Sequence, residues 1–300
     1  MVDLVVVGSI ALDSMKTPFG DVKDVLGEAA TYSSVAASIF CKPGIVGVVG
    51  ADFPREHIDF LKKRNIVTEG LEVSEGKTFR WGGYYEYDMN QAHTTNTELN
   101  VLSTFKPKVP KSYLGTKYLF LANIDPVLQL DVLSQFKKTK FVALDTMNFW
   151  ISTKKKELMD VVAKVNLLLI NDAEARQLMG TTNLVKAARG LLKCGPDAVI
   201  IKKGEHGALL FTDGICFSAP GYPLEDVKDP TGAGDSFAGG LMGYLASTDD
   251  TSVENMKKGV VYGSAIASYD TEDFSLNKLK KITRADVNDR YKAFEKLVEF

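Results

Sequence analysis

Short apolar runs alternate with helical patterns along most of this chain, and this alternation constrains the fold more than any other feature. The apolar runs fall at residues 118–121, 141–144, 165–170 and 198–202, and apolar residues at helical spacing fill 127–136, 154–163, 173–179 and 184–192. A continuous apolar run is typical of a parallel strand buried on both faces, and parallel strands need a crossover connection, usually a helix. We therefore predict an α/β fold, in which helices flank a doubly wound, Rossmann-like parallel sheet and ligands bind beyond the carboxyl ends of its strands.

The N-terminal residues fit the same plan. Residues 4–7 form an apolar run that ends at Gly8 and Ser9, and residues 45–52 have the pattern of a second strand and its loop. An amphipathic helical pattern follows at 53–64. The first run therefore predicts a buried parallel strand whose carboxyl end opens onto a site.

One glycine-rich segment carries the chemistry: Asp229-Pro230-Thr231-Gly232-Ala233-Gly234-Asp235-Ser236-Phe237. Its proline and glycines end the preceding structure and let the backbone approach a ligand closely. The next residues begin a helical pattern, and the free N–H groups and dipole of a helix start make an anion site. A carboxylate on the first turn, such as Asp235, is ordinarily a stabilising helix-start charge. Beside an anion site, it is also placed to take a proton from a hydroxyl that attacks a phosphate.

This segment closely resembles the signature of the ribokinase-like (pfkB-type) carbohydrate kinases. The resemblance implies that Asp235 is the catalytic base and that the N–H groups of Gly232, Ala233 and Gly234 hold the charge of the transferred phosphoryl group. It also implies ATP and Mg²⁺ as cofactors. The implied acceptor is a hydroxyl group of a sugar or sugar-like molecule, and we predict that this group is a hydroxymethyl. The chain has no Gly-x-x-x-x-Gly-Lys-Ser/Thr segment, so its phosphate site is not a P-loop.

Residues on the acceptor side extend the resemblance. Asp13 ends a Gly-Ser-(apolar)-x-x-Asp pattern whose acid bonds sugar hydroxyls in the family, and Asn123 and Asp125 lie where members place substrate-facing polar residues. Glu28 and Tyr32 depart from the family's Gly-Gly-x-x-x-Asn segment, replacing its second glycine and its asparagine. A phenol offers a hydrogen-bonding group and a ring face. We therefore expect Tyr32 to contact the substrate, and a nucleoside remains an alternative to a sugar.

Other segments resemble the family's nucleotide side. Asn171 and Glu174 match an Asn-x-x-Glu motif that organises Mg²⁺ and phosphate, although an asparagine there is also a common helix cap. Mg²⁺ keeps much of its hydration, so a Glu acting through water is chemically sensible. The predicted cofactor contacts are Asn171, Lys202, Gly204, Gly207 and Thr231, with Glu174 on Mg²⁺ through water.

Near the C-terminus, two features leave alternatives open. Residues 254–269 predict a helix rich in small residues, which either leave room for an adenine ring or permit close helix packing. Residues 270–274 correspond to a family loop whose backbone carbonyls help to bind a monovalent cation such as K⁺.

Residues 66–105 differ in composition from the rest of the chain, because β-branched and aromatic residues are more frequent there, with glycines between them. That composition predicts strands, and the simplest interpretation is an edge sheet with cross-strand aromatic pairs. The resemblance makes these strands, with residues 13–28, a discontinuous β lid over a main domain of 1–12, 29–65 and 106–300. An isolated sheet closes on the body or pairs with another chain, so a homodimer through the lid is a further hypothesis.

Composition narrows the remaining possibilities. The net charge of −2 gives no electrostatic footprint for nucleic acid or an anionic membrane, and no apolar run approaches the roughly 18–20 residues of a membrane span. Cys41, Cys194 and Cys216 fit neither a disulfide framework nor a zinc site, which predicts a cytoplasmic protein. A non-catalytic nucleotide- or sugar-binding module is the alternative from another class. A dinucleotide oxidoreductase is disfavoured, because the glycine fingerprint is missing after the first strand.

Overall fold

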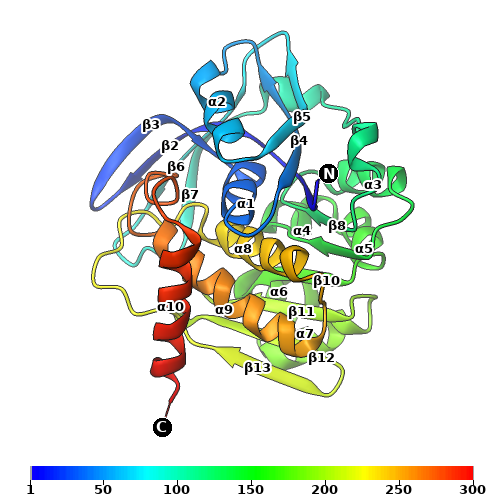
Figure 1. Cartoon of the computed structure of the whole chain (residues 1–300), viewed down its shortest axis with the longest axis vertical. Helices are drawn as coiled ribbons and strands as arrows, with labels where there is room; N and C mark the ends of the chain where they lie inside the picture. Colours follow the sequence, from blue (N-terminus) through cyan, green and yellow to red (C-terminus); the bar gives the residue numbers. More distant parts are fainter. Residues whose placement is uncertain (1, 300) are drawn as a thin grey trace.

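Most of the strands belong to one large, mainly parallel sheet. The computed structural model describes residues 2–299, and within that span nine strands pair in this order: β13 (Ile215–Ala219), β12 (Ala208–Thr212), β11 (Ala198–Lys202), β10 (Leu167–Asn171), β9 (Phe141–Leu144), β8 (Tyr118–Leu121), β1 (Leu4–Val7), β4 (Pro43–Gly50) and β5 (Val67–Ser74). The strands from β5 to β11 are parallel. The chain runs outward from β1 in both directions, which confirms the predicted doubly wound sheet (Figure 1).

An antiparallel hairpin, β12 and β13, closes one edge of this sheet and was not predicted. Its two strands are joined by Asp213 and Gly214, and Gly214 has a φ of 75°. An Asp-Gly pair between two apolar runs is a strong hairpin signal, so the sequence did contain the information.

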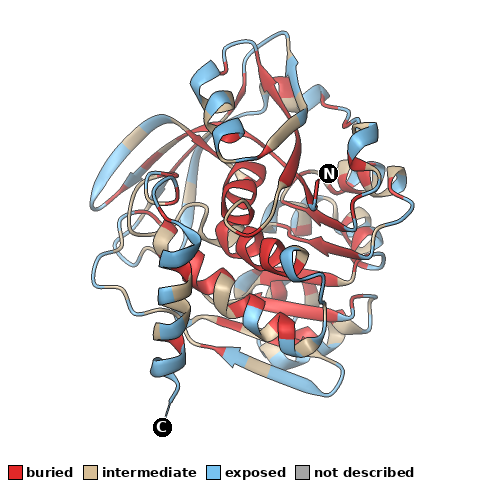
Figure 2. Cartoon of the chain, in the orientation of Figure 1, coloured by how far each residue is buried: buried red, intermediate tan, exposed pale blue. Residues whose placement is uncertain are grey.

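Helices cover both faces of the sheet. One face carries α1 (Ala29–Ala37), α2 (Arg55–Lys63), α8 (Ala233–Thr248), α9 (Val253–Asp270) and α10 (Arg284–Leu297). The other carries α3 (Pro126–Gln135), α4 (Asn148–Thr153), α5 (Lys155–Val162), α6 (Asp172–Met179) and α7 (Leu184–Leu192). Successive residues of β1 show why: Leu4 and Val6 belong to the first core, whereas Val5 and Val7 belong to the second. Figure 2 shows α1 buried along its whole length and α8 buried in its middle.

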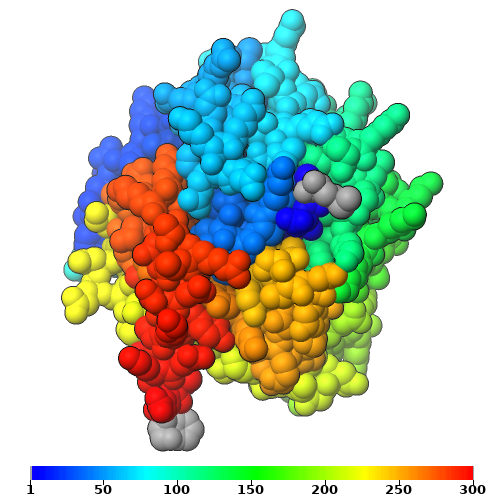
Figure 3. Space-filling model, in the orientation of Figure 1, coloured from blue at the N-terminus to red at the C-terminus, as the bar shows by residue number. Residues whose placement is uncertain are grey.

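The glycine-rich segment at residues 229–235, which we call the phosphate loop because it is the predicted phosphate site, leads into α8. This helix packs closely on two neighbours through glycines. A Cβ on Gly239 would lie 2.2 Å from the carbonyl oxygen of Ser33 in α1, and one on Gly263 of α9 would lie 2.7 Å from the carbonyl oxygen of Phe237. Of the two interpretations of the small residues in α9, close helix packing is therefore the one that the geometry supports at Gly263. The helix α10, which was not predicted, begins with a capping box between Thr283 and Asp286 and lies on the outside of this layer (Figure 3).

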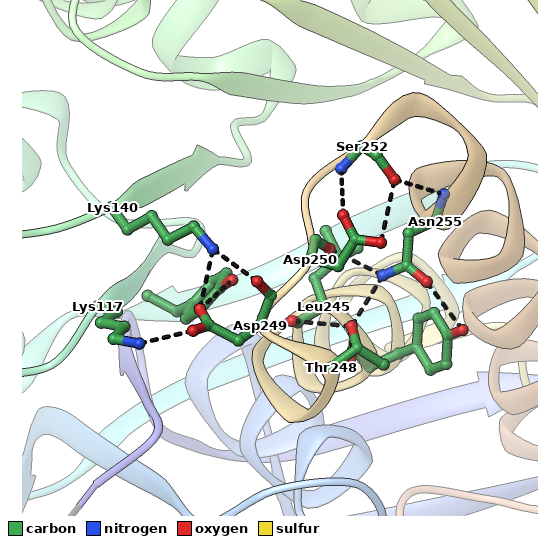
Figure 4. A network of polar contacts seen from close by, with 10 residues as sticks. Lys117, Lys140, Leu245, Thr248, Asp249, Asp250, Ser252 and Asn255 are labelled. Atoms are coloured by element: carbon green, nitrogen blue, oxygen red, sulfur yellow. Dashed lines mark hydrogen bonds and ion pairs between the residues drawn. The ribbon is translucent and has the colours of Figure 1, made fainter.

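The C-terminal end of α8 is fastened to the amino ends of β8 and β9 (Figure 4). Asp249, which caps the helix at a φ of 49°, accepts hydrogen bonds from Lys117 at 2.6 Å, Tyr118 at 3.0 Å and Lys140 at 3.0 Å. Because this end meets the amino ends of the strands, the opposite end of α8 faces their carboxyl ends. The helix start that holds the phosphate loop is thereby placed where ligands are expected.

The second sheet has the strand order β3 (Gly20–Gly27), β2 (Ala11–Thr17), β6 (Phe79–Tyr85) and β7 (Ala92–Glu98). Its strands come from the two segments predicted to form a lid, with two differences. β2 begins at Ala11, whereas the predicted segment begins at residue 13. Residues 67–74, assigned to the lid, form β5, which pairs with β4 at the edge of the large sheet. Their residues are only partly buried, so their composition did not distinguish an edge strand of the main sheet from a lid strand. Short 3₁₀ turns follow, at η1 (Asn100–Thr104), η2 (Lys111–Tyr113) and η3 (Gly204–His206).

Side chains tie this lid to the main domain. Arg80 of β6 forms ion pairs with Asp24 of β3 and with Asp52, which follows β4. Asp52 also accepts hydrogen bonds from the backbone and side chain of Thr78, both at 2.7 Å. None of the helices in the described chain is long and apolar enough to cross a membrane.

Candidate active site

The phosphate loop turns on Gly232, the residue before α8. Its φ of 82° lies in the left-handed region, and a Cβ there would stand 2.4 Å from the ring of Tyr32. Glycine is therefore required both by the backbone and by the ring beneath it. Tyr32, which we expect to contact the substrate, has a fully buried side chain that lies against the loop. Its ring supports the turn, and its contact with the substrate stays a prediction.

Some backbone N–H groups of this loop donate hydrogen bonds within the protein, and others have no acceptor there. The buried carboxylate of Asp229 accepts from the N–H of Thr231 at 3.0 Å and from that of Ser275 at 3.3 Å, which fixes the start of the loop. Ala233 donates its N–H to the carbonyl of Pro230 at 3.2 Å, so this predicted anion-binding donor already has a partner.

Within the part of the chain that the structure describes, the N–H groups of Gly232, Gly234 and Asp235 have no protein acceptor. The free donors therefore differ from the predicted set by one residue, with Asp235 in the place of Ala233. A turn hydrogen bond from residue 233 to residue 230 cannot be read from a glycine count.

Asp235 lies on the first turn of α8, half-buried, and Ser33 of α1 donates a hydrogen bond to its carbonyl at 3.0 Å. Burial and, to a smaller extent, the charge of Asp145 raise the pKa of its carboxyl, the charge of Lys202 partly offsets them, and the net pKa is about 8. A carboxyl with a pKa in this range can change protonation state near neutral pH, as a general base must.

A single ammonium group faces this carboxylate from the large sheet. Lys202, the last residue of β11, donates a hydrogen bond to Asp145 at 2.6 Å, and its Nζ would lie 3.2 Å from a Cβ placed on Gly234. Although burial lowers the pKa of Lys202, the charge of Asp145 raises it, and the net shift is upward. Lys202 is therefore a fixed cation over the glycine loop.

Asn171 and Glu174 form a reciprocal capping box at the start of α6. Asn171 accepts from the N–H of Glu174 at 2.8 Å, and Glu174 accepts from the N–H of Asn171 at 2.9 Å. Burial, followed by the charge of Asp145, raises the pKa of Glu174 to about 7. The capping interpretation of Asn171 is confirmed. Nowhere in residues 2–299 do three His, Cys, Asp or Glu residues form a group that could hold a metal by themselves.

The two glycines of the predicted nucleotide loop serve the local backbone. Gly204 and Gly207 have φ values of 55° and 81°. A Cβ on Gly207 would lie 2.1 Å from the carbonyl oxygen of Ala219, so this position is closed by packing against the end of β13. Gly204 is more open, and Asn90 of the lid lies nearest to it, at 3.7 Å.

Two carboxylates, those of Asp13 and Glu28, lie beside the end of β1, on the side where we expect the acceptor. Asp13 of β2 is almost fully buried, its Oδ1 has no hydrogen-bond partner, and its carboxylate lies where a side chain on Gly27 would be. Glu28 accepts a hydrogen bond from the hydroxyl of Ser9 at 2.6 Å. Burial, followed by the charge of Glu28, raises the pKa of Asp13 well above its ordinary value.

Asn123 and Asp125 differ in how far the structure supports them. Asn123 lies at the carboxyl end of β8, where its side chain accepts from Trp150 at 3.0 Å and its carbonyl accepts from Ser9. Asp125 caps α3 through Val127 and forms an ion pair with Lys154. Both of its carboxylate oxygens have local partners, and its role as a substrate contact stays a prediction.

Two residues of this site were not predicted. Glu28 was noted only as a departure from a glycine, although an acid at a position where glycine is expected is itself a signal. Tyr85 of β6 was grouped with the lid aromatics, but the hydroxyl of Thr231 donates to its phenolic oxygen at 3.3 Å. Which lid residue meets the loop depends on sheet register, which the sequence does not state.

Known proteins resemble this chain over nearly its whole length. A cytidine kinase from Thermococcus kodakarensis is 32% identical over 252 residues, covering 81% of this chain and 89% of that protein. The crystal structure of a nucleoside kinase from Methanocaldococcus jannaschii superposes with a TM-score of 0.78 at 20% identity, covering 97% of this chain and 99% of that one. A fructokinase from Vibrio cholerae with bound fructose, ADP and calcium ion superposes with a TM-score of 0.77 at 18% identity, covering 96% and 98%.

These likenesses agree with the family of the sequence itself. Residues 2–278 match the pfkB family carbohydrate kinases, so the match extends from the second residue to beyond the phosphate loop and α9. The chain therefore belongs to the pfkB family of carbohydrate kinases.

Proposed function

We propose that this protein is an ATP-dependent kinase that transfers the γ-phosphoryl group to a hydroxymethyl group of a nucleoside or sugar. One observation carries the proposal: the carboxylate of Asp235 stands at a helix start whose N–H donors are free, with the ammonium of Lys202 over the same loop. A base, an anion site and a fixed cation are the groups that phosphoryl transfer needs.

In this proposal Asp235 removes the proton of the acceptor hydroxyl as its oxygen attacks the γ-phosphorus. The free N–H groups of Gly232, Gly234 and Asp235 hold the phosphoryl oxygens, where each such donor contributes on the order of 3–4 kcal/mol in comparable anion sites. Lys202 neutralises part of the charge that develops on the phosphates. Asp145, which pairs with Lys202, keeps the ammonium in place.

A nucleotide and Mg²⁺ fit the donor set on the side of β10 and β11. Glu174 and Asp145 present carboxylate oxygens, the ligand type that Mg²⁺ prefers, and Mg²⁺ commonly retains several waters and binds substrate phosphates. Glu174 would hold the ion through water, and the ion would neutralise phosphate charge. Bound ADP and calcium ion in the fructokinase of the same fold support a nucleotide and a cation as ligands of this protein. A monovalent cation near residues 270–274 stays part of the proposal.

For the acceptor, we favour a molecule with a ribosyl group, and specifically a nucleoside. The relative that is 32% identical is a cytidine kinase. In this chain, the two carboxylates of Asp13 and Glu28 suit vicinal hydroxyls. A free sugar is the second candidate, because the same carboxylates would bind it equally well.

The test is a panel of ribonucleosides, pentoses, hexoses and polyols, incubated with ATP and Mg²⁺, with phosphorylated product detected directly by mass spectrometry. We expect transfer to at least one acceptor with a ribosyl group. Saturable binding of an acceptor and of ATP without any phosphorylated product would overturn the kinase proposal in favour of a binding module. Preference for a free pentose over every nucleoside would select the second candidate.

We also propose a homodimer formed through the lid sheet, because a four-stranded sheet beside the body leaves a second face available. Sedimentation velocity at micromolar concentration tests this directly, and a monomer there would exclude it. The three cysteines are free thiols, and we place the enzyme in the cytoplasm, where such thiols persist and ATP is available.

A further inference from the structure

The backbone of Glu28 lies in a region that favours glycine. Its φ of 73° and ψ of 167° fall where a side chain on an L-residue meets its own backbone, and such conformations cost free energy in any residue other than glycine. Nothing about the helix start requires this side chain, because Glu28 makes no side-chain cap to α1. Glycine would avoid this strain, so the presence of glutamate indicates that its side chain has a function.

The side chain of Glu28 reaches the acceptor end of the site. Its Oε2 accepts a hydrogen bond from Ser9, whose hydroxyl also lies 3.2 Å from the carbonyl oxygen of Asn123. Glu28 therefore stands over the carboxyl ends of β1 and β8. Since Glu28 is only partly buried and a carboxylate has about four acceptor positions, it keeps capacity for a further donor.

A second and independent observation points to a hydroxyl-bearing ligand at the same place. Asp13, which is 1% exposed, has an Oδ1 atom without any hydrogen-bond partner. Buried acceptors are normally paired, and an unpaired one costs free energy. The charge of Glu28 acts on both Asp13 and Asp235, so the three carboxyl groups share one region.

We infer that Glu28 is a second hydroxyl-binding carboxylate of the acceptor site and that, with Asp13, it selects neutral, polyhydroxylated acceptors over acceptors that carry an acid group. This inference rests on the proposed kinase function. Two carboxylates accept from two hydroxyls of one acceptor, while an acceptor carboxylate or phosphate at the same place would meet like charge.

The experiment compares wild type with Glu28→Gly, Glu28→Ala and Glu28→Gln, using the best acceptor of the panel and its monodeoxy analogues. In Glu28→Gly and Glu28→Ala we expect the KM for the acceptor to rise about 10-fold to 100-fold, because a hydrogen bond to a charged group is lost. The KM for ATP should stay unchanged. Glu28→Gln keeps an acceptor oxygen and should lose less. Wild type should bind one of the monodeoxy analogues less tightly than the parent acceptor. Glu28→Gly should bind that analogue and the parent acceptor equally tightly.

Stability separates a lost contact from a lost fold. Glu28→Gly relieves the backbone and should raise Tm, whereas Glu28→Ala keeps the strain and should not. Asn65→Gly is the matched control: Asn65 is exposed after α2 with a φ of 62°, so the change relieves a positive φ without touching the acceptor KM.

Two results have distinct meanings. Absence of transfer by wild type to every acceptor would overturn the proposed function itself. Transfer by wild type, with acceptor KM values in all three Glu28 variants within twofold of it, would overturn only the role of Glu28.

Discussion

Gly232 shows how much of the site depends on a residue without a side chain. We expect Gly232→Ala to lower the free energy of unfolding by about 1–3 kcal/mol, because alanine is strained at a φ of 82° and its Cβ would meet the ring of Tyr32. Its kcat should fall as well, since the free N–H groups would be displaced. Denaturant unfolding and steady-state kinetics measure the two effects.

Tyr32→Phe is the matched control, because it keeps the ring and removes only a buried hydroxyl that has no hydrogen-bond partner. We expect unchanged or greater stability and an unchanged acceptor KM. A clear rise in acceptor KM in Tyr32→Phe would mean that the phenol reaches the substrate after all.

Protonation of Asp235 should set the pH dependence of the reaction. Because the pKa of this carboxyl is raised from the ordinary 3.8 to about 8, its base form is populated only as pH rises through that value. We expect kcat/KM for the acceptor to increase with pH up to about 8 and then level off. A profile that is flat between pH 6 and 9 would show that Asp235 is not the titrating base.

The same shift has an opposite consequence for stability. A carboxyl whose pKa is raised on folding stabilises the fold below its unfolded-state pKa, and that contribution is lost as pH rises through the folded-state value. Asp235→Asn should therefore gain in Tm relative to wild type as pH rises toward 8, and melting curves across pH measure this.

Individual residues were predictable where chemistry fixes them and not where packing does. Asp235, Lys202 and Asp13 follow from motif and spacing, and the structure brings them to one edge of the sheet. The burial of Tyr32 and the ion pair of Asp125 with Lys154 could not be predicted, because hydrogen-bonding capacity does not reveal which neighbours a side chain already has. Burial and local partners are properties of the folded chain alone.

At the scale of elements, the lid and the phosphate loop meet through Tyr85 and Thr231. We expect Tyr85→Phe to raise the acceptor KM about 2-fold to 10-fold, the loss of one neutral hydrogen bond, while Tm stays unchanged. The neighbouring Tyr84 is exposed and stacks on His93, so Tyr84→Phe is a control that should behave as wild type. Equal kinetics in the two variants would remove the link between lid and loop.

Elements of the sheet core were the most predictable part of the fold. The bounds of β1, β8, β9 and β11 coincide with the predicted apolar runs, because strands buried on both faces leave a continuous apolar signal. β5 was assigned to the wrong sheet, since it is a half-exposed edge strand whose partner is set by topology. The hairpin of β12 and β13 was missed although its Asp-Gly turn is a sequence signal.

At the scale of the whole molecule, the helix α8 connects the sheet, the neighbouring helices and the candidate site. α8 is fixed to the amino ends of β8 and β9 through Asp249, packs on α1 and α9 through glycines, and presents its free N–H groups at the carboxyl ends of the strands. The fold thus determines where the proposed anion site lies, and the lid brings Asp13 and Glu28, the carboxylates that we propose bind the acceptor, to the same region.

The most direct measurement is the rate of phosphoryl transfer by Asp235→Asn, with saturating ATP, Mg²⁺ and the best acceptor, in protein shown to be folded by its melting curve. We expect kcat to fall by about 100-fold or more, because the base is lost while the anion site remains. A kcat within a few-fold of wild type would contradict the assignment of Asp235 and, with it, the mechanism.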